Sequence, residues 1–292
     1  MIDFLKYRYF CALFSLLILV AGISAYVYKG GFDYSVEFTG GTQVLMRFSE
    51  PIDSNKIKDV LKDKGFQGVD LREFSKNETL IKVQEFSSDA QGTGERIQSA
   101  LNEALPNVKT EILQTDSVGP AAGATLKYDS IKAVLIALLA IMLYIGIRFK
   151  FAYAIGAIVA LFHDAIVILV FFLLINREIS IDVIAAIVAI LGYSINDTIV
   201  IFNQIRENVK KMKTSSIEEV VNVSINQTLR RTILTSFSTS LVVLSLIIFG
   251  GEALRSLSLA LMIGIIFGTY SSIYIASPVM LLFYKDEKNK IA

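Results

Sequence analysis

Two acidic side chains lie inside long apolar stretches of this sequence. An ionisable group at the centre of a bilayer costs about 2.5 to 3.5 kcal/mol on insertion scales, so each needs a reason to be there. Asp164 lies 14 residues into an apolar stretch, and Asp197 lies nine residues before Arg206, which puts both near mid-depth of a membrane helix. A carboxyl group that is removed from water favours its protonated, neutral form. It can release the proton when water or a cation reaches it, and a proton relay needs this property. The pattern predicts coupling to protons at both acids, and residue types alone allow sodium equally.

Structural interpretations of the same residues stay open. Asp197 could be a structural acid bonded to Asn196, Tyr193 or hydroxyl groups of the fifth apolar stretch. His163 adjoins Asp164, but adjacent helical residues point about 100° apart, so a neutral histidine bonded to the backbone is an alternative to a relay. Arg231 either completes the ion-coupling set or, with Arg230, anchors the helix at the membrane face.

Small residues recur every four positions beside the acids, which places them on one ridge of each helix. Small side chains let helices approach closely in lipid, so each acid is expected on a packed stripe that faces protein. A similar ridge in the last apolar stretch is interpreted as packing rather than as a site. The three ridges are Ala152, Gly156, Ala160 and Asp164; Ala185, Ala189, Tyr193 and Asp197; and Gly264, Gly268, Ser272 and Ala276.

The elements that must position these residues are membrane helices. Of the 292 residues, 53% are hydrophobic and 19% charged, and the mean hydropathy is +0.56. The 28 Lys and Arg nearly cancel the 27 Asp and Glu, so nothing indicates a nucleic-acid partner. Cys11 and His163 are the single cysteine and histidine, which excludes a disulfide framework, a cysteine-rich metal site and a paired-histidine protease. We therefore expect no metal, no cofactor and no enzymatic chemistry.

Six apolar stretches are long enough to cross a bilayer, since about 20 helical residues span its core. The first lacks a clear cleavage site, so we expect a membrane helix rather than a signal peptide. The stretches are 9–28, 133–147, 151–175, 183–203, 232–249 and 256–284.

Orientation follows from the short connections between these stretches. One set of faces carries 13 basic residues, whereas the opposite short loops carry Arg177 and Arg255. Because basic connections stay in the cytoplasm, both termini are expected there. The expected organisation is a cytoplasmic N-terminus and first helix (1–28), an outer domain (29–129), five further helices (130–284) and a cytoplasmic tail (285–292).

The segment 29–129 has the changing periodicity of a folded domain. Strands are predicted at 42–48, 69–74, 79–86 and 109–115, and helices at 53–64 and 94–105. The order strand, helix, strand, strand, helix, strand is the ferredoxin-like α+β arrangement. A loop at 250–255 joins the fifth and sixth helices.

Several motifs in this order resemble the SecF family, and the resemblance covers nearly the whole chain. The family's Gly-Gly-Thr segment is matched by Gly40, Gly41 and Thr42. Similar segments are Val118-Gly-Pro120, Phe162-His-Asp164, Gly192-Tyr-Ser-Ile-Asn-Asp-Thr-Ile-Val200, Gln227-Thr-Leu-Arg-Arg-Thr232 and Gly268-Thr-Tyr-Ser-Ser-Ile-Tyr-Ile-Ala-Ser-Pro278. Three positions depart from the family pattern, Glu37 for Asp, Ser35 for Gly and Arg230 for a frequent His.

The resemblance implies a six-helix half of the resistance-nodulation-division superfamily, paired with SecD in the bacterial cytoplasmic (inner) membrane. It further implies that the pair assists the SecYEG channel, with YajC and YidC as possible further partners. The proton-motive force would draw a translocating preprotein outward. Asp197 and Arg231 match positions that the family is thought to use in proton conduction.

Two other classes of protein remain as alternatives. A small-molecule or lipid exporter of the superfamily would share the membrane acids, but it would carry a second outer domain before its last helices. A scaffold for other membrane proteins would leave the buried acids unexplained.

Overall fold

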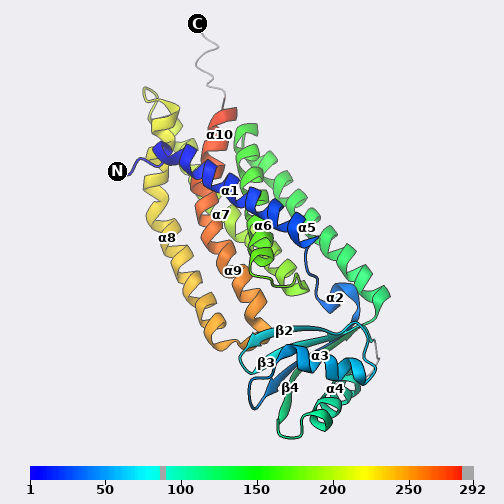
Figure 1. Cartoon of the computed structure of the whole chain (residues 1–292). Coiled ribbons are helices and arrows are strands. Elements are labelled where there is room, and N and C mark those ends of the chain that lie inside the picture. Colours follow the sequence, from blue (N-terminus) through cyan, green and yellow to red (C-terminus); the bar gives the residue numbers. More distant parts are fainter. Residues whose placement is uncertain (86–89, 285–292) are drawn as a thin grey trace. The chain divides into compact units, whose positions relative to one another are not determined.

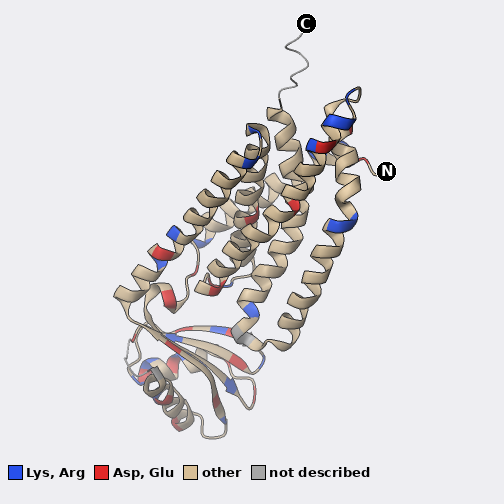
Figure 2. Ribbon diagram, turned by 180° about the vertical axis from the view of Figure 1, so that it is seen from behind, with Lys and Arg blue, Asp and Glu red and all other residues tan. Residues whose placement is uncertain are grey.

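A computed structural model describes residues 1–85 and 90–284 of the chain. It divides into two compact units, one of residues 1–33 together with the chain from Lys132 onward, and one of Tyr34–Ile131. Lys, Arg, Asp and Glu are sparse along the helices of the first unit and frequent in the second (Figure 2). The predicted tail at 285–292 lies outside the described residues.

The second unit is an antiparallel sheet with two helices on one face. Its chain order is α2 (Val36–Thr39), β1 (Gly41–Phe48), α3 (Ser54–Asp63), β2 (Asp70–Ser75), β3 (Glu78–Val83), α4 (Ala90–Ala104) and β4 (Thr110–Val118). The four strands lie in the order β2-β3-β1-β4, and each neighbouring pair is antiparallel. This is the predicted ferredoxin-like arrangement, with bounds shifted by a few residues (Figure 1). Phe86, the predicted end of the third strand, lies outside the described residues.

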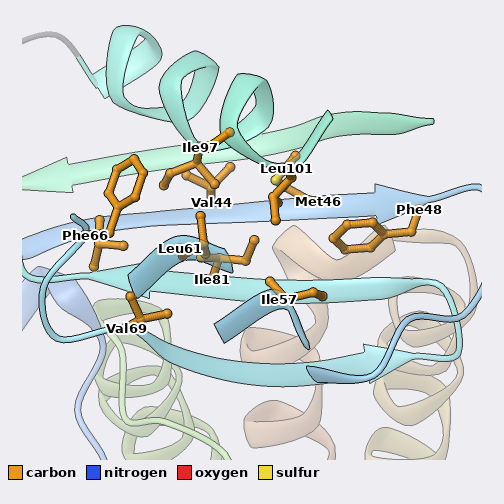
Figure 3. Close-up of a cluster of buried hydrophobic side chains, with 12 residues drawn as sticks. Val44, Met46, Phe48, Ile57, Leu61, Phe66, Val69, Ile81, Ile97 and Leu101 are labelled. Atoms are coloured by element: carbon orange, nitrogen blue, oxygen red, sulfur yellow. The ribbon is translucent and has the colours of Figure 1, made fainter. Parts of the chain in front are cut away.

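The core of this unit follows from the alternation of side chains along a strand. Val44, Met46 and Phe48 of β1 point to the same face and are all buried. They pack against Ile57 and Leu61 of α3 and against α4, as Figure 3 shows. Helix α3 begins as predicted, because the Asp53 carboxylate accepts a hydrogen bond from the backbone N–H of Asn55.

The first unit holds the membrane helices. A short 3-10 turn η1 (Leu5–Tyr7) precedes α1 (Arg8–Lys29), and α5 (Pro120–Arg148) enters this unit at Lys132. The other elements are α6 (Phe151–Leu174), α7 (Ile181–Lys211), α8 (Ile217–Phe249), α9 (Gly251–Ser271), the π-helical turn η2 (Ser272–Ala276) and α10 (Ser277–Phe283). Among the described residues, six helical segments are long and apolar enough to cross a membrane, which confirms the predicted spans. Helices α6 and α7 are the most buried of them, and α9 packs against both and against α8.

Three helices extend well beyond their apolar stretches. Helix α5 begins at Pro120 rather than Ala133, and proline suits a first helical turn because its missing N–H would have no helical partner. Helix α7 continues to Lys211, and α8 begins at Ile217 rather than Thr232. The start of α8 is capped by Ser216, whose hydroxyl accepts a hydrogen bond from the backbone N–H of Glu219.

The sixth span is helical throughout but contains a π-helical turn, η2, after which Pro278 occupies the first turn of α10. Proline has no N–H to donate to the preceding turn, and this favours an irregular pattern of backbone hydrogen bonds in the helix before it. The connection between the fifth and sixth spans is short, as expected, and shorter than the predicted 250–255, since Gly250 alone separates α8 from α9.

Candidate functional site

Asp164 lies on α6 at the centre of a network of hydroxyl groups. Its carboxylate is fully buried and accepts hydrogen bonds from Ser194 of α7 at 2.6 Å and from Ser271 of α9 at 2.9 Å. Both donors reach the same oxygen, Oδ2. This acid therefore ties three helices together.

His163 completes the surroundings of Asp164. Its Nδ1 atom lies 3.4 Å from Asp164 Oδ1, so these neighbours contact each other although adjacent helical residues need not. The imidazole ring packs beside the rings of Phe267 and Tyr270, at centroid distances of 6.4 and 6.0 Å. The other ring nitrogen, Nε2, is buried and has no hydrogen-bond partner among the described residues.

Asp197 lies on α7 in a looser setting. Its side chain is 3% exposed, and its one hydrogen bond among the described residues comes from Ser236 of α8 at the long distance of 3.5 Å. Ser236 is also bonded to Thr269 of α9 at 2.6 Å. One turn before Ser236, the Thr232 hydroxyl is buried without a partner in the part of the chain that the structure describes. Asp197 is thus a buried acid with few fixed contacts.

The remaining candidates around Asp197 take different positions. Arg231 of α8 is exposed and forms no ion pair with Asp197 among the described residues. Tyr193 donates a hydrogen bond to Thr239 of α8 at 3.2 Å. Asn196 is exposed on α7. The sequence suggested Asn196, Tyr193 or a hydroxyl of the fifth span as a structural partner of Asp197. The structure provides the hydroxyl, that of Ser236.

The predicted ridges are correct on α6 and wrong in part on α7. Ala152, Gly156 and Ala160 are buried with Asp164, whereas Ala185 and Ala189 are exposed. Four residues advance a helix by about 400°, so a ridge drifts by about 40° at each step. Over twelve residues the drift is about 120° on both helices, but α6 is buried over more of its surface than α7, so the small residues leave the packed face only on α7.

The ridge of the sixth span packs closely, as expected. A Cβ atom at Gly264 would lie 2.4 Å from Ile190 of α7, and one at Gly268 would lie 3.1 Å from Ser194. Farther along, Ser272 is bonded to Thr198 of α7 at 2.9 Å.

The Gly-Gly-Thr segment lies in the second unit, and its backbone conformation explains why both positions are glycine. Gly40 and Gly41 have φ values of +77° and +117°, which side chains disfavour. A Cβ atom at Gly40 would lie 2.7 Å from the backbone of Pro120, and one at Gly41 would lie 2.6 Å from the carbonyl oxygen of Val83. The buried Thr42 hydroxyl bonds to Ser117 and donates to the carbonyl of Glu85, each at 2.8 Å. This segment fixes the start of β1 against β3 and β4.

Sequence reasoning expected the hydroxyl groups of the fifth span near Asp197, which Ser236 provides, but it missed the hydroxyls of Ser194 and Ser271 that contact Asp164 from α7 and α9. Ser194 and Ser271 stand within apolar runs, which is a weak signal for a buried polar contact. No group of three His, Cys, Asp or Glu that could hold a metal ion occurs among the described residues.

Comparison with known proteins decides the family. The family model described as Protein export membrane protein SecD/SecF, C-terminal, matches residues 97–286, and the one described as SecD/SecF GG Motif matches residues 29–52. The protein translocase subunit SecF of Thermodesulfovibrio yellowstonii is 39% identical over 290 residues, which cover 98% of this chain and 95% of that protein. The chain belongs to the SecF family of protein translocase subunits.

A further SecF relative and a solved structure agree with this assignment. SecF of Rickettsia felis is 38% identical over 292 residues, covering 99% of this chain and 94% of that protein. The crystal structure of SecDF from Thermus thermophilus, described as a translocon-associated membrane protein, has a TM-score of 0.86 and 35% identity. The match covers 97% of this chain but 38% of the SecDF chain, so most of SecDF has no counterpart here.

Proposed function

We propose that this SecF-family chain promotes protein export together with SecD, driven by an ion gradient that acts through Asp197. The family assignment supports an export role, since the matched relatives are named as translocase subunits. The likeness to SecDF supports SecD as the partner. The proposed place of action is the outer side of the SecYEG channel, where a translocating preprotein emerges, with YajC and YidC as further candidate partners.

The observation that carries the proposed coupling is the contrast between the two membrane acids. Asp164 is held by two short hydrogen bonds and a histidine, so changing its protonation would disturb three helices at once. Asp197 is also buried but has one long hydrogen bond. A buried acid with few fixed partners can gain and lose a proton at small cost in local structure. Asp197 is therefore the proposed coupling acid, and Asp164 the proposed structural one.

The electrostatics of Asp197 suggest how a proton would do work. Protonation removes the buried charge and weakens its attraction to Arg231 or to a group of the partner subunit. The halves of the complex then repack, and the outer domain moves with them. One proton that crosses 100 mV supplies about 2.3 kcal/mol, which biases a two-state movement but does not unfold a stable substrate.

The proposed location is the bacterial cytoplasmic membrane, with both termini in the cytoplasm and the sheet domain outside. The distribution of basic residues among the short connections supports this orientation. The absence of a second outer domain separates the proposal from the exporter alternative, because Gly250 alone joins α8 to α9 in the described chain.

Export of a secreted precursor tests the proposal. Pulse-chase labelling is carried out in cells depleted of their own SecD-SecF and complemented with this chain and its cognate SecD. The chain is supplied as wild type, as Asp197→Asn and as the matched control Asp182→Asn, an exposed acid on the same helix. We expect export with wild type and control but not with Asp197→Asn, at equal membrane levels.

The other outcomes are informative. Rescue by Asp197→Asn would keep the export role and make Asp197 structural. Failure of all three chains to rescue, with the complex assembled, would contradict the export role itself. Replacing the proton gradient with a sodium gradient in the same cells distinguishes the two coupling ions.

A further inference from the structure

A groove runs along the surface of the helical unit between α1, α6 and α10. Its volume of about 740 Å³ falls within the range of about 300–1,000 Å³ that is typical of ligand sites. Most of the lining is aliphatic, with Leu16 and Leu19 from α1, Val159 and Ile166 from α6, and Leu282 from α10. A groove of this kind on a membrane helix bundle suits an acyl chain.

One end of the groove carries a pair of opposite charges. Arg8 is the first residue of α1 and Glu218 the second of α8, and Arg8 Nη1 lies 2.6 Å from Glu218 Oε1. Both side chains are partly exposed, at 28% and 58%. The Arg8 guanidinium also lies 5.0 Å from the ring centre of Tyr9, an exposed aromatic residue of the kind found at membrane interfaces. This end of the groove is therefore a charged rim at the start of a membrane helix.

A buried polar atom borders the groove at a deeper level. His163 belongs to the lining, and its Nε2 atom has no hydrogen-bond partner among the described residues. Ser15 of α1 is another polar residue of the lining. It lies seven positions after Arg8, so the groove continues for at least about 10 Å along the helix from the charged rim. Because the Nε2 atom is itself buried, the charged contacts that the groove offers lie at its rim, at Arg8 and Glu218.

We propose that this groove binds one phospholipid with a phosphoethanolamine headgroup. The phosphate lies at Arg8 and the primary ammonium at Glu218, so each charge of the rim meets the opposite charge of the lipid. One acyl chain follows the aliphatic lining. The site does not depend on the proposed export role.

The rim chemistry separates this lipid from other phospholipids. Phosphatidylglycerol can satisfy Arg8 but brings no cation for Glu218. Phosphatidylcholine has the same net charge as phosphatidylethanolamine, yet its quaternary ammonium has no N–H to donate to the Glu218 carboxylate. The preference should therefore be greatest for the primary ammonium.

Lipid retention by the purified complex with SecD tests the proposal. The complex is incubated in mixed micelles that contain phosphatidylethanolamine, phosphatidylglycerol and phosphatidylcholine in equal amounts, and retained lipid is counted by native mass spectrometry. We expect one tightly held phosphatidylethanolamine, preferred roughly three- to tenfold, since a charge-assisted hydrogen bond to an exposed group contributes a factor of this order.

Variants locate the preference at the rim. Glu218→Gln should abolish the preference, and Glu218→Lys should shift it to phosphatidylglycerol. The adjacent exposed residue provides the matched control, because Glu219 does not line the groove and Glu219→Gln should keep the preference. Ala12→Trp, which fills the groove, should reduce retention of every lipid. Equal retention of the three lipids by wild type, or a preference that survives in Glu218→Gln, would overturn the proposal.

Discussion

Gly156 on α6 offers a direct test of how the π-helical turn of the sixth span packs. A Cβ atom at this position would lie 2.4 Å from the carbonyl oxygen of Ala276 in η2. Cβ atoms essentially never come closer than 3.0 Å to such an atom, so in Gly156→Ala the turn must retreat by about 0.6 Å or more. Inserting a methyl group into a packed interior typically costs about 1–3 kcal/mol.

The matched control is Gly146→Ala on α5, where a Cβ atom meets no other heavy atom within 4 Å. Both substitutions gain helix propensity, at most about 1 kcal/mol, so their difference isolates the packing cost. We expect Gly156→Ala to lower the free energy of unfolding by about 1–3 kcal/mol relative to Gly146→Ala. Denaturant titration of the purified complex with SecD, followed by circular dichroism, measures this difference. Equal stability of the two variants would refute the close approach of α6 to η2.

Three further substitutions probe other contacts. Asp164→Ala leaves the hydroxyls of Ser194 and Ser271 without their shared acceptor and should lower the free energy of unfolding by about 1–3 kcal/mol in the same titration, whereas Asp182→Ala should not. Tyr270→Phe removes the hydrogen bond to the carbonyl of Cys11 at 2.6 Å, so a maleimide should label that buried cysteine faster than in wild type; an unchanged rate would contradict this contact. Leu61→Ala opens a cavity in the fully packed core of the sheet domain and should cost about 2–5 kcal/mol, seen as faster limited proteolysis of that domain, and unchanged proteolysis would argue against the core.

The fold could be predicted well where one physical signal dominates. Long apolar runs gave the six spans, and alternation gave the strands whose buried faces include Val44 and Met46. Helix ends were predicted poorly, because hydropathy ends where charges begin but the helical backbone continues. Two residues mark the true helix starts: Ser216 caps α8, and Pro120 suits the first turn of α5.

The acids of the site were predicted, but their contacts were predicted only in part. Asp164 and Asp197 are identifiable because a charge in an apolar run is costly. Their hydroxyl partners depend on how helices rotate against each other, and Ser271 bonds to Asp164 across 107 positions of the chain. The exposed Ala185 shows the limit of a four-residue ridge, whose period differs from the 3.6 residues of a helical turn.

The central claim, ion coupling at Asp197, is tested most directly by forward movement of an arrested preprotein. Inverted membrane vesicles hold SecYEG, SecD and this chain, translocation is begun with the SecA ATPase, and ATP is then removed before a proton-motive force is imposed. We predict that the preprotein advances with wild type and Asp182→Asn, stops on addition of an uncoupler, and does not advance with Asp197→Asn. Advance at the wild-type rate with Asp197→Asn would contradict the claim.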